Sequence, residues 1–176
     1  SESVRKGVLE NFDVSADNVV TLWDIPSGAS LGRLPDHFVK SMLKGLGLDS
    51  GYLFFPSHGW PHKNHEKLIL AFAKAKGLFP NLRLVLTGGE LGPDHPALKR
   101  IGELGLEQSV KHLGYRTPLE IRCLYRGAAA LVYPSLFEGF GMPVAEAILA
   151  GTPVVCSDII PLREIGGDAI VIFDPR

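Results

Sequence analysis

The chain has 176 residues, of which 45% are hydrophobic and 21% are charged, and its formal net charge is −1. This length and composition are typical of one soluble domain with a substantial core, and the mixed charges exclude a basic surface for nucleic acid. Because we find no signal peptide and no bilayer-spanning apolar run, we expect a cytoplasmic protein. Cys123 and Cys156 lack metal-type spacing and are expected to be small buried residues.

The beginning of the chain does not resemble the start of a self-contained domain. Residues 1–12 predict a helix, residues 19–23 a short apolar strand, and residues 24–33 a loop. The initiator methionine is also missing. We therefore divide the chain into a lead-in over residues 1–50, with a linker from a missing N-terminal domain, and a domain over residues 51–176.

From Gly51 onward, apolar runs alternate with segments of helical periodicity. Strands are predicted at residues 52–56, 82–87, 110–113, 129–133, 153–156 and 169–173. Helices are predicted at residues 65–76, 95–104, 118–127, 143–150 and 161–165. Strands that are apolar on both faces and alternate with helices are typical of a parallel sheet covered on two sides. The sequence thus predicts a doubly wound, Rossmann-like α/β domain with its ligand at the carboxyl ends of the strands.

The segment 134–153 combines several features of an anion-binding site. It follows a predicted strand, and Gly139 and Gly141 would let the backbone approach a ligand closely. Pro143 suits the first position of a helix, and Gly151 suits the position that ends it. The free amides at the start of that helix would attract a diphosphate.

Each of these features also has an ordinary structural explanation. A Gly-x-Gly turn before a helix is a common way to change direction, and Glu146 is an acidic residue of a kind favoured in a helix's first turns. Glu138 and Glu146 are eight residues apart, but so are Glu2 and Glu10, without evident meaning. The coincidence of strand end, glycines, proline and both carboxylates in one segment is what favours a ligand site.

The run Glu138-Gly-Phe-Gly-Met-Pro-Val-Ala-Glu146 resembles the E-x7-E signature of the GT4 family of glycosyltransferases. Further segments resemble that family at residues 84–88, 112–115, 124–128, 161–168 and 173–175. The likeness is strong over residues 51–176 and looser over 1–50. It implies the C-terminal, donor-binding half of a two-domain GT-B enzyme that transfers a hexose from a nucleoside-diphosphate sugar with retention.

The resemblance also implies the partners of the site. The acceptor, a glycan or a lipid-linked sugar, would be held by the missing N-terminal domain, and peripheral membrane association of the full-length enzyme is left open. The segment around residues 60–65 is similar to a subgroup rich in GDP-mannose enzymes, which favours mannose, with UDP-linked sugars a close second. No cofactor is implied. We expect the isolated fragment to bind nucleotide and to turn over little or no substrate.

Roles for individual residues follow from the same resemblance. Glu146 would accept hydrogen bonds from the ribose hydroxyls, and Glu138 would bond a hydroxyl of the donor sugar. Lys63 would stabilise the negative charge that builds on the leaving diphosphate, so Lys63 and Glu138 are the candidate catalytic residues. The sugar and phosphates would be positioned by the backbone around Gly139, Phe140, Gly141 and Met142.

The residues before Lys63 depart from the family pattern. Many relatives place a Gly-Arg pair five residues before this lysine, where the chain has Ser57 and His58. Either a protonated His58 or the amide of Asn64 would then contact the phosphates in place of the arginine.

Two further loops hold candidate donor-binding residues. By family likeness Leu113 and Tyr115 would line the nucleobase pocket, although Leu113 suits the core equally well. Thr87 and Gly88 end another predicted strand, and they either approach the phosphates or form a plain turn.

Other functions are less consistent with these residues. A metal site at His58, His62 and His65 is disfavoured because Gly59 and Pro61 interrupt any helix that could align two of them. A GT-B nucleotide-sugar epimerase would bind a similar donor, and a non-catalytic nucleotide-binding module differs only in the content of the missing half. A dehydrogenase is disfavoured because no Gly-x-Gly-x-x-Gly follows the first strand of the sheet.

Overall fold

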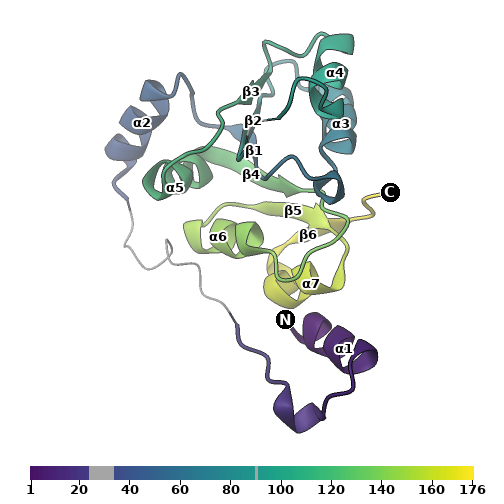
Figure 1. Ribbon diagram of the computed structural model, residues 1–176. Coiled ribbons are helices and arrows are strands. Elements are labelled where there is room, and N and C mark those ends of the chain that lie inside the picture. The colour runs from purple at the N-terminus through teal and green to yellow at the C-terminus, as the bar shows by residue number, and fades with distance from the viewer. Residues whose placement is uncertain (24–33, 90) are drawn as a thin grey trace.

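The computed structural model describes residues 1–23, 34–89 and 91–176. A parallel sheet of six strands forms its centre, in the order β3-β2-β1-β4-β5-β6 (Figure 1). The strands are β1 (Tyr52–Pro56), β2 (Leu84–Thr87), β3 (Val110–His112), β4 (Ala128–Tyr133), β5 (Val154–Ser157) and β6 (Val171–Phe173). The chain builds outward from β1 to β3 and then returns to the other side of β1. A topological switch point therefore lies between β1 and β4, and the predicted doubly wound α/β fold is confirmed.

Helices cover both faces of this sheet. The described helices are α1 (Glu2–Asn11), α2 (Asp36–Gly45), α3 (His65–Leu78), α4 (Pro96–Glu103), α5 (Pro118–Gly127), α6 (Met142–Ala150) and α7 (Ile160–Gly166). Short 3-10 turns lie at Ala16–Asn18, Pro61–Lys63 and Gly167–Ala169. In Figure 1, α3 and α4 lie on one face of the sheet and α2, α5 and α6 on the other. None of the described helices is long and apolar enough to cross a membrane.

Two neighbouring residues of β1 show why the strands are apolar on both faces. Phe54 packs edge-on against Tyr125 of α5, with ring centroids 5.1 Å apart. Phe55 points to the opposite face and packs against His65 of α3, at 4.8 Å. Successive side chains of a strand point to opposite faces, so a strand covered on both sides needs an apolar residue at every position.

Glycines set both ends of α6, the helix that carries the second glutamate of the motif. Gly141 precedes the helix with a φ of 106°, and Gly151 ends it with a φ of 73°. Glycine adopts this left-handed backbone without steric cost, so the predicted C-terminal glycine is confirmed. The helix begins at Met142, one residue before the predicted start, and Pro143 therefore occupies its second position.

The lead-in differs from the prediction in one element. The helix predicted at residues 1–12 is confirmed as α1, but the strand predicted at residues 19–23 is wrong. Val20 and Leu22 are 75% and 83% exposed, and an apolar run without a neighbouring strand has no partner for its backbone hydrogen bonds. The loop predicted at residues 24–33 lies outside the described residues.

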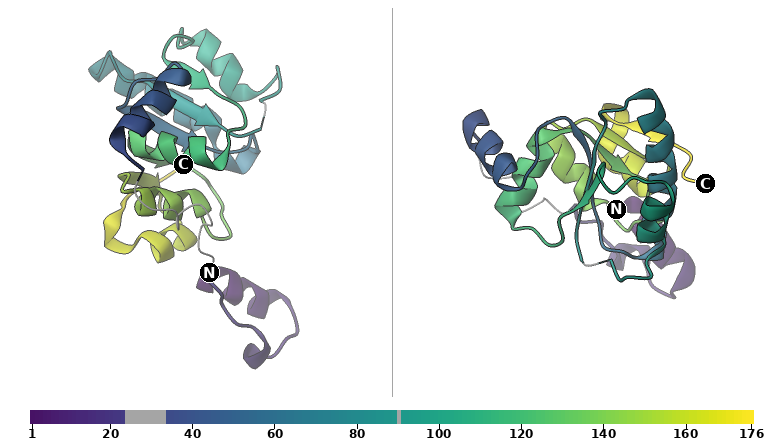
Figure 2. Two further views of the ribbon diagram at one scale, coloured as in Figure 1. Left: turned by 90° about the vertical axis from the view of Figure 1, so that its left-hand side faces the viewer. Right: turned by 90° about the horizontal axis from the view of Figure 1, so that it is seen from above.

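Helix α1 lies beyond α7, away from the sheet (Figures 1 and 2). The carboxylate of Glu164 on α7 accepts hydrogen bonds from the backbone amides of Glu2 and Ser3, at 2.9 and 2.8 Å. These amides have no partner within α1, and a carboxylate also offsets the positive end of the helix. Because α1 buries none of its own residues, these polar contacts are a main part of its docking.

Helix α2 was not predicted, yet it contributes to the core. Val39 and Leu43 are buried, and α2 packs along α5 on the same face of the sheet. An added Cβ at Gly127 of α5 would lie 2.4 Å from Leu43 Cδ1, so glycine makes room for this contact. The core therefore extends to residues before 51, whereas the domain boundary of the whole protein stays a prediction.

Candidate functional site

Two predicted site residues lie at the carboxyl ends of neighbouring strands. Lys63 closes the turn behind β1, and Glu138 lies in the loop between β4 and α6. The backbone ties these loops together, since the amide of Leu136 donates to the carbonyl oxygen of His62 at 2.7 Å. Because β1 and β4 pair at the switch point, the fold brings together two residues that are 75 positions apart.

Lys63 and Glu138 form a largely buried ion pair. Lys63 Nζ lies 2.5 Å from Glu138 Oε1 and donates to the hydroxyl oxygen of Tyr133 at 3.0 Å. The two side chains are only 11% and 10% exposed, a setting in which an unpaired charge is costly. Within the described part of the chain, these contacts use two of the three N–H donors of the ammonium.

Tyr133, the last residue of β4, is hydrogen-bonded to Lys63 of this pair and is 1% exposed. Burial, followed by the charge of Glu138 and a hydrogen bond to it, raises the pKa of the Tyr133 phenol well above its ordinary value. The hydroxyl therefore stays protonated, and it can donate to Glu138 while it accepts from Lys63. Sequence reasoning missed Tyr133 because an aromatic residue that ends an apolar strand looks like part of the core.

Glu146, on α6, is held from α5 by a second buried tyrosine. The Tyr125 hydroxyl donates to Glu146 Oε2 at 2.8 Å, and Tyr125 is 2% exposed. Burial raises the pKa of Glu146, and the hydrogen bond from Tyr125 opposes that rise by stabilising the carboxylate. The charges of Glu138 and Glu146 both raise the pKa of Tyr133, so both carboxylates lie near the Tyr133 hydroxyl.

The fold requires one of the two loop glycines and not the other. A Cβ at Gly141 would lie 2.3 Å from a leucine side chain of α7, and its φ of 106° is itself strained for other residues. At Gly139 a Cβ would meet only Val4, at 3.9 Å, which is an ordinary contact. Met142 then begins α6, whose first turn receives no side-chain cap.

The N-terminal segment also contacts this loop. The hydroxyl of Ser1 donates to the carbonyl oxygen of Gly139 at 2.7 Å. Phe140 packs edge-on against Trp23, with ring centroids 5.9 Å apart. The loop that carries Glu138 is therefore in contact with residues from the start of the chain.

His58 and Tyr115, from the loops after β1 and β3, lie together. Tyr115 Oη is 3.4 Å from His58 Nδ1, and the His58 ring also stacks on Trp60 at 5.2 Å. Tyr115 is 69% exposed. These rings form an aromatic surface at the carboxyl end of the sheet.

Three other predicted site residues make contacts within the fold. A Cβ at Gly88, where φ is 128°, would lie 2.2 Å from the backbone of the loop after β1, so glycine is needed there for packing. Leu113 is partly buried against the core. Asn64 Nδ2 donates to the carbonyl oxygens of Pro134 and Pro175 at 3.1 and 3.0 Å. The roles of these three residues toward a donor stay predictions.

The histidines near Lys63 are not arranged as metal ligands. Among residues 1–23, 34–89 and 91–176, no group of three or more His, Cys, Asp or Glu side chains could hold a metal ion. His65 is buried and packs against Phe55 and His95. Burial, and next the charge of His95, lowers the pKa of His65 to about 4, so its imidazole is neutral near pH 7.

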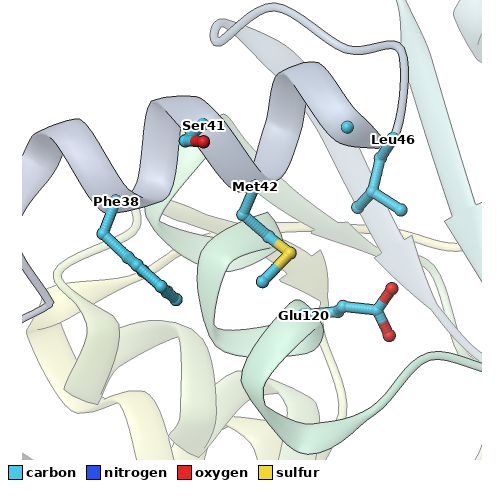
Figure 3. Close-up of a pocket in the computed structure, with 6 residues that line it drawn as sticks. Phe38, Ser41, Met42, Leu46 and Glu120 are labelled. Carbon is cyan, nitrogen blue, oxygen red and sulfur yellow. The ribbon is translucent and has the colours of Figure 1, made fainter.

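A pocket of about 360 Å³ lies between α2 and α5 (Figure 3). Phe38 and Met42 of α2 line it, together with Leu46, which follows α2, and Glu120 of α5. The carboxylate of Glu120 is already bonded to Thr117 in the capping box that begins α5. None of the predicted site residues lines this pocket.

Sequence comparison finds relatives along the whole chain. The family described as glycosyl transferases group 1 matches residues 44–176. O-antigen chain mannosyltransferase B of Escherichia coli is 31% identical over 181 residues, which cover 100% of this chain and 46% of that protein. O-antigen chain mannosyltransferase RfbU of Salmonella typhimurium is 26% identical, with 99% and 45% covered. The chain thus spans about half the length of these curated relatives.

Solved structures share the fold. The Anabaena protein Alr3699/HepE, crystallised with UDP and glucose, matches with a TM-score of 0.83 at 23% identity, over 99% of this chain and 48% of that one. A glycosyltransferase from Rickettsia africae matches with a TM-score of 0.84 at 18% identity, over 100% and 48%. The predicted Rossmann-like fold of the GT-B enzymes is therefore confirmed. From the family match and the 31% identity along its whole length, this chain belongs to the glycosyl transferases group 1 family.

Proposed function

We propose that this chain is the donor-binding part of a retaining glycosyltransferase, which transfers a hexose from a nucleoside-diphosphate sugar to a glycan or lipid-linked acceptor. The observation that carries the proposal is the buried Lys63–Glu138 pair at the switch point of the sheet. Ligands of doubly wound sheets bind at such points. An ammonium that is already fixed in place suits the charge of a leaving diphosphate, because it needs no reorganisation during the reaction.

The contacts of each residue suit the role that the family signature implies. The remaining donor of Lys63 would bind a diphosphate oxygen, and Glu138, 2.5 Å from the ammonium, would bond a hydroxyl of the donor sugar. Glu146 Oε2 accepts from Tyr125, and its other oxygen would accept from the ribose. Gly139 supports the same picture, because the fold does not need glycine there, whereas a closely approaching sugar would.

The aromatic surface is our candidate for the nucleobase. Tyr115 is exposed and contacts His58, the residue that replaces the arginine of many relatives. An aromatic ring provides a stacking face for any base, so this surface accommodates guanine and uracil alike. The sugar and the base are therefore proposed from the relatives: curated relatives are named mannosyltransferases, and structural neighbours hold UDP or UDP-glucose. We favour mannose, from GDP-mannose.

Because the chain covers less than half of these relatives, transfer itself is proposed for the whole protein. A further domain outside this chain would bind the acceptor. We propose no cofactor beyond the donor substrate, and we assign to the full-length protein any association with a membrane surface.

A calorimetric titration of GDP, UDP and ADP into the full-length protein tests this proposal. We expect GDP or UDP to bind more tightly than about millimolar, and Lys63→Met to reduce transfer from the matching sugar donor by about 100-fold or more. The same titration of residues 1–176 shows whether the further domain completes the site. If no nucleoside diphosphate binds to the full-length protein, the roles given to Lys63, Glu138 and Glu146 are wrong.

A further inference from the structure

Three tyrosines are buried almost completely, and two of them direct their hydroxyls at the proposed site. Tyr52, Tyr125 and Tyr133 are each 1–2% exposed and are among the largest buried side chains. The hydroxyl of Tyr52 donates to the backbone carbonyl of Leu124 at 2.8 Å, as a structural tyrosine does. The hydroxyls of Tyr125 and Tyr133 instead bond side chains of the E-x7-E motif and its lysine.

We propose that Tyr133 and Tyr125 are positioning residues of the donor site. Tyr133 fixes the Lys63–Glu138 pair that faces the sugar and the diphosphate, and Tyr125 fixes the carboxylate of Glu146 for the ribose. This inference rests on the proposed function, because it assumes that these three charged residues meet the donor.

Tyr133 contacts the ion pair from a ring that is packed in the core. Its ring packs against Phe55 of β1, with centroids 5.7 Å apart, and its backbone belongs to the central strand β4. The hydroxyl accepts from Lys63 at 3.0 Å, and the Glu138 carboxylate lies close enough to raise the pKa of the phenol. Without the hydroxyl, the ammonium would lose one of its two partners at a position where only 11% of its side chain is exposed. The ammonium would then be held by Glu138 alone, and a buried donor that loses a hydrogen-bond partner costs free energy.

Tyr125 holds Glu146 in a similar way from the neighbouring helix. The Tyr125 ring packs against Phe54, with centroids 5.1 Å apart, and the hydroxyl meets Glu146 Oε2 at 2.8 Å. The described part of the chain offers Glu146 Oε1 no hydrogen bond. The contact thus orients one oxygen and leaves the other to accept from a ribose hydroxyl.

The test removes one hydroxyl at a time from the full-length protein, with Tyr52→Phe as the matched control. Tyr133→Phe, Tyr125→Phe and Tyr52→Phe each keep a buried ring and remove one hydroxyl with its hydrogen bonding, so all three should lower Tm by a few degrees. Tyr133→Phe should also lower kcat by about tenfold or more while nucleoside-diphosphate affinity changes little. Tyr125→Phe should weaken nucleoside diphosphate by about tenfold, which corresponds to about 1.4 kcal/mol, without changing the affinity for pyrophosphate. Tyr52→Phe should leave kcat and both affinities unchanged.

Two further measurements separate the outcomes. If Tyr133 acts through Lys63, the losses of Tyr133→Phe and Lys63→Met should not add in the double variant, and additive losses would overturn the assignment of Tyr133. The inference is also wrong if Tyr133→Phe and Tyr125→Phe behave like Tyr52→Phe, or if Tyr52→Phe lowers kcat as much as they do. When Lys63→Met and Glu146→Gln impair the protein and the tyrosine variants do not, only this inference fails. When Lys63→Met and Glu146→Gln also have no effect, the proposed function fails with it.

Discussion

Removing one partner of the Lys63–Glu138 pair should strongly lower the free energy of unfolding, because both side chains are buried. The side chains are 11% and 10% exposed, so Lys63→Met leaves a carboxylate that water reaches poorly. We expect a loss of about 3 kcal/mol in the free energy of unfolding, the lower end for breaking a buried pair. Glu138→Gln leaves an amide oxygen for the ammonium and should cost about 2 kcal/mol. The double variant leaves no unpaired charge and should lose no more than Lys63→Met, which gives a coupling energy of at least about 2 kcal/mol.

Urea unfolding followed by circular dichroism measures the free energies for this cycle. The Arg100–Glu66 pair is the matched control, because its atoms are 2.7 Å apart but its side chains are 37% and 44% exposed. The corresponding cycle with Arg100→Met and Glu66→Gln should give a coupling below about 1 kcal/mol. Equal couplings for the two pairs, or a loss below about 1 kcal/mol for Lys63→Met, would refute the reasoning from burial.

Three further predictions concern the loop, a helix end and pH. Gly141→Ala should lower the free energy of unfolding by about 1–3 kcal/mol, since φ is 106° and the new Cβ would lie 2.3 Å from a leucine. Gly139→Ala should change the free energy of unfolding by less than about 1 kcal/mol and should weaken only donor binding. Thr117→Ala removes the capping box of α5 and should cost about 1 kcal/mol, read as a lower Tm; an unchanged Tm would count against the cap. Burial lowers the pKa of His65 from 6.5 to about 4, so the unfolded state binds more protons in that range and stability falls as the pH falls from 6.5 toward 4. The loss in the free energy of unfolding should reach about 3 kcal/mol at pH 4 compared with pH 7, measured by urea unfolding. His65→Gln should remove this loss. If stability depends on pH equally steeply in that variant, other groups cause the dependence.

The sheet could be predicted because each strand carries its own pattern. A run such as β2, buried at all four positions, has to be covered on both faces, and helices between such runs imply a doubly wound order. Lys63 and Glu138 could both be proposed for one site only through the family resemblance, and the pairing of β1 with β4 brings their loops together. The strand predicted at residues 19–23 failed because an apolar run specifies no partner, and pairing needs one.

The supporting residues of the site could not be predicted in the same way. Tyr133 and Tyr125 lie in apolar segments, and only the fold shows that their hydroxyls meet charged side chains and not the backbone. Gly88 illustrates the opposite case. It was a candidate for phosphate contact, but its close approach to the neighbouring loop already explains the glycine.

We propose above that Glu146 meets the ribose of a nucleoside-diphosphate donor bound at this site. It is tested most directly by calorimetric titration of the full-length protein and its Glu146→Gln variant with the better-binding nucleoside diphosphate and with pyrophosphate. We expect the variant to bind the nucleoside diphosphate about tenfold or more weakly and to bind pyrophosphate as the parent does. An equal loss for both ligands, or no loss for either, would contradict the ribose assignment.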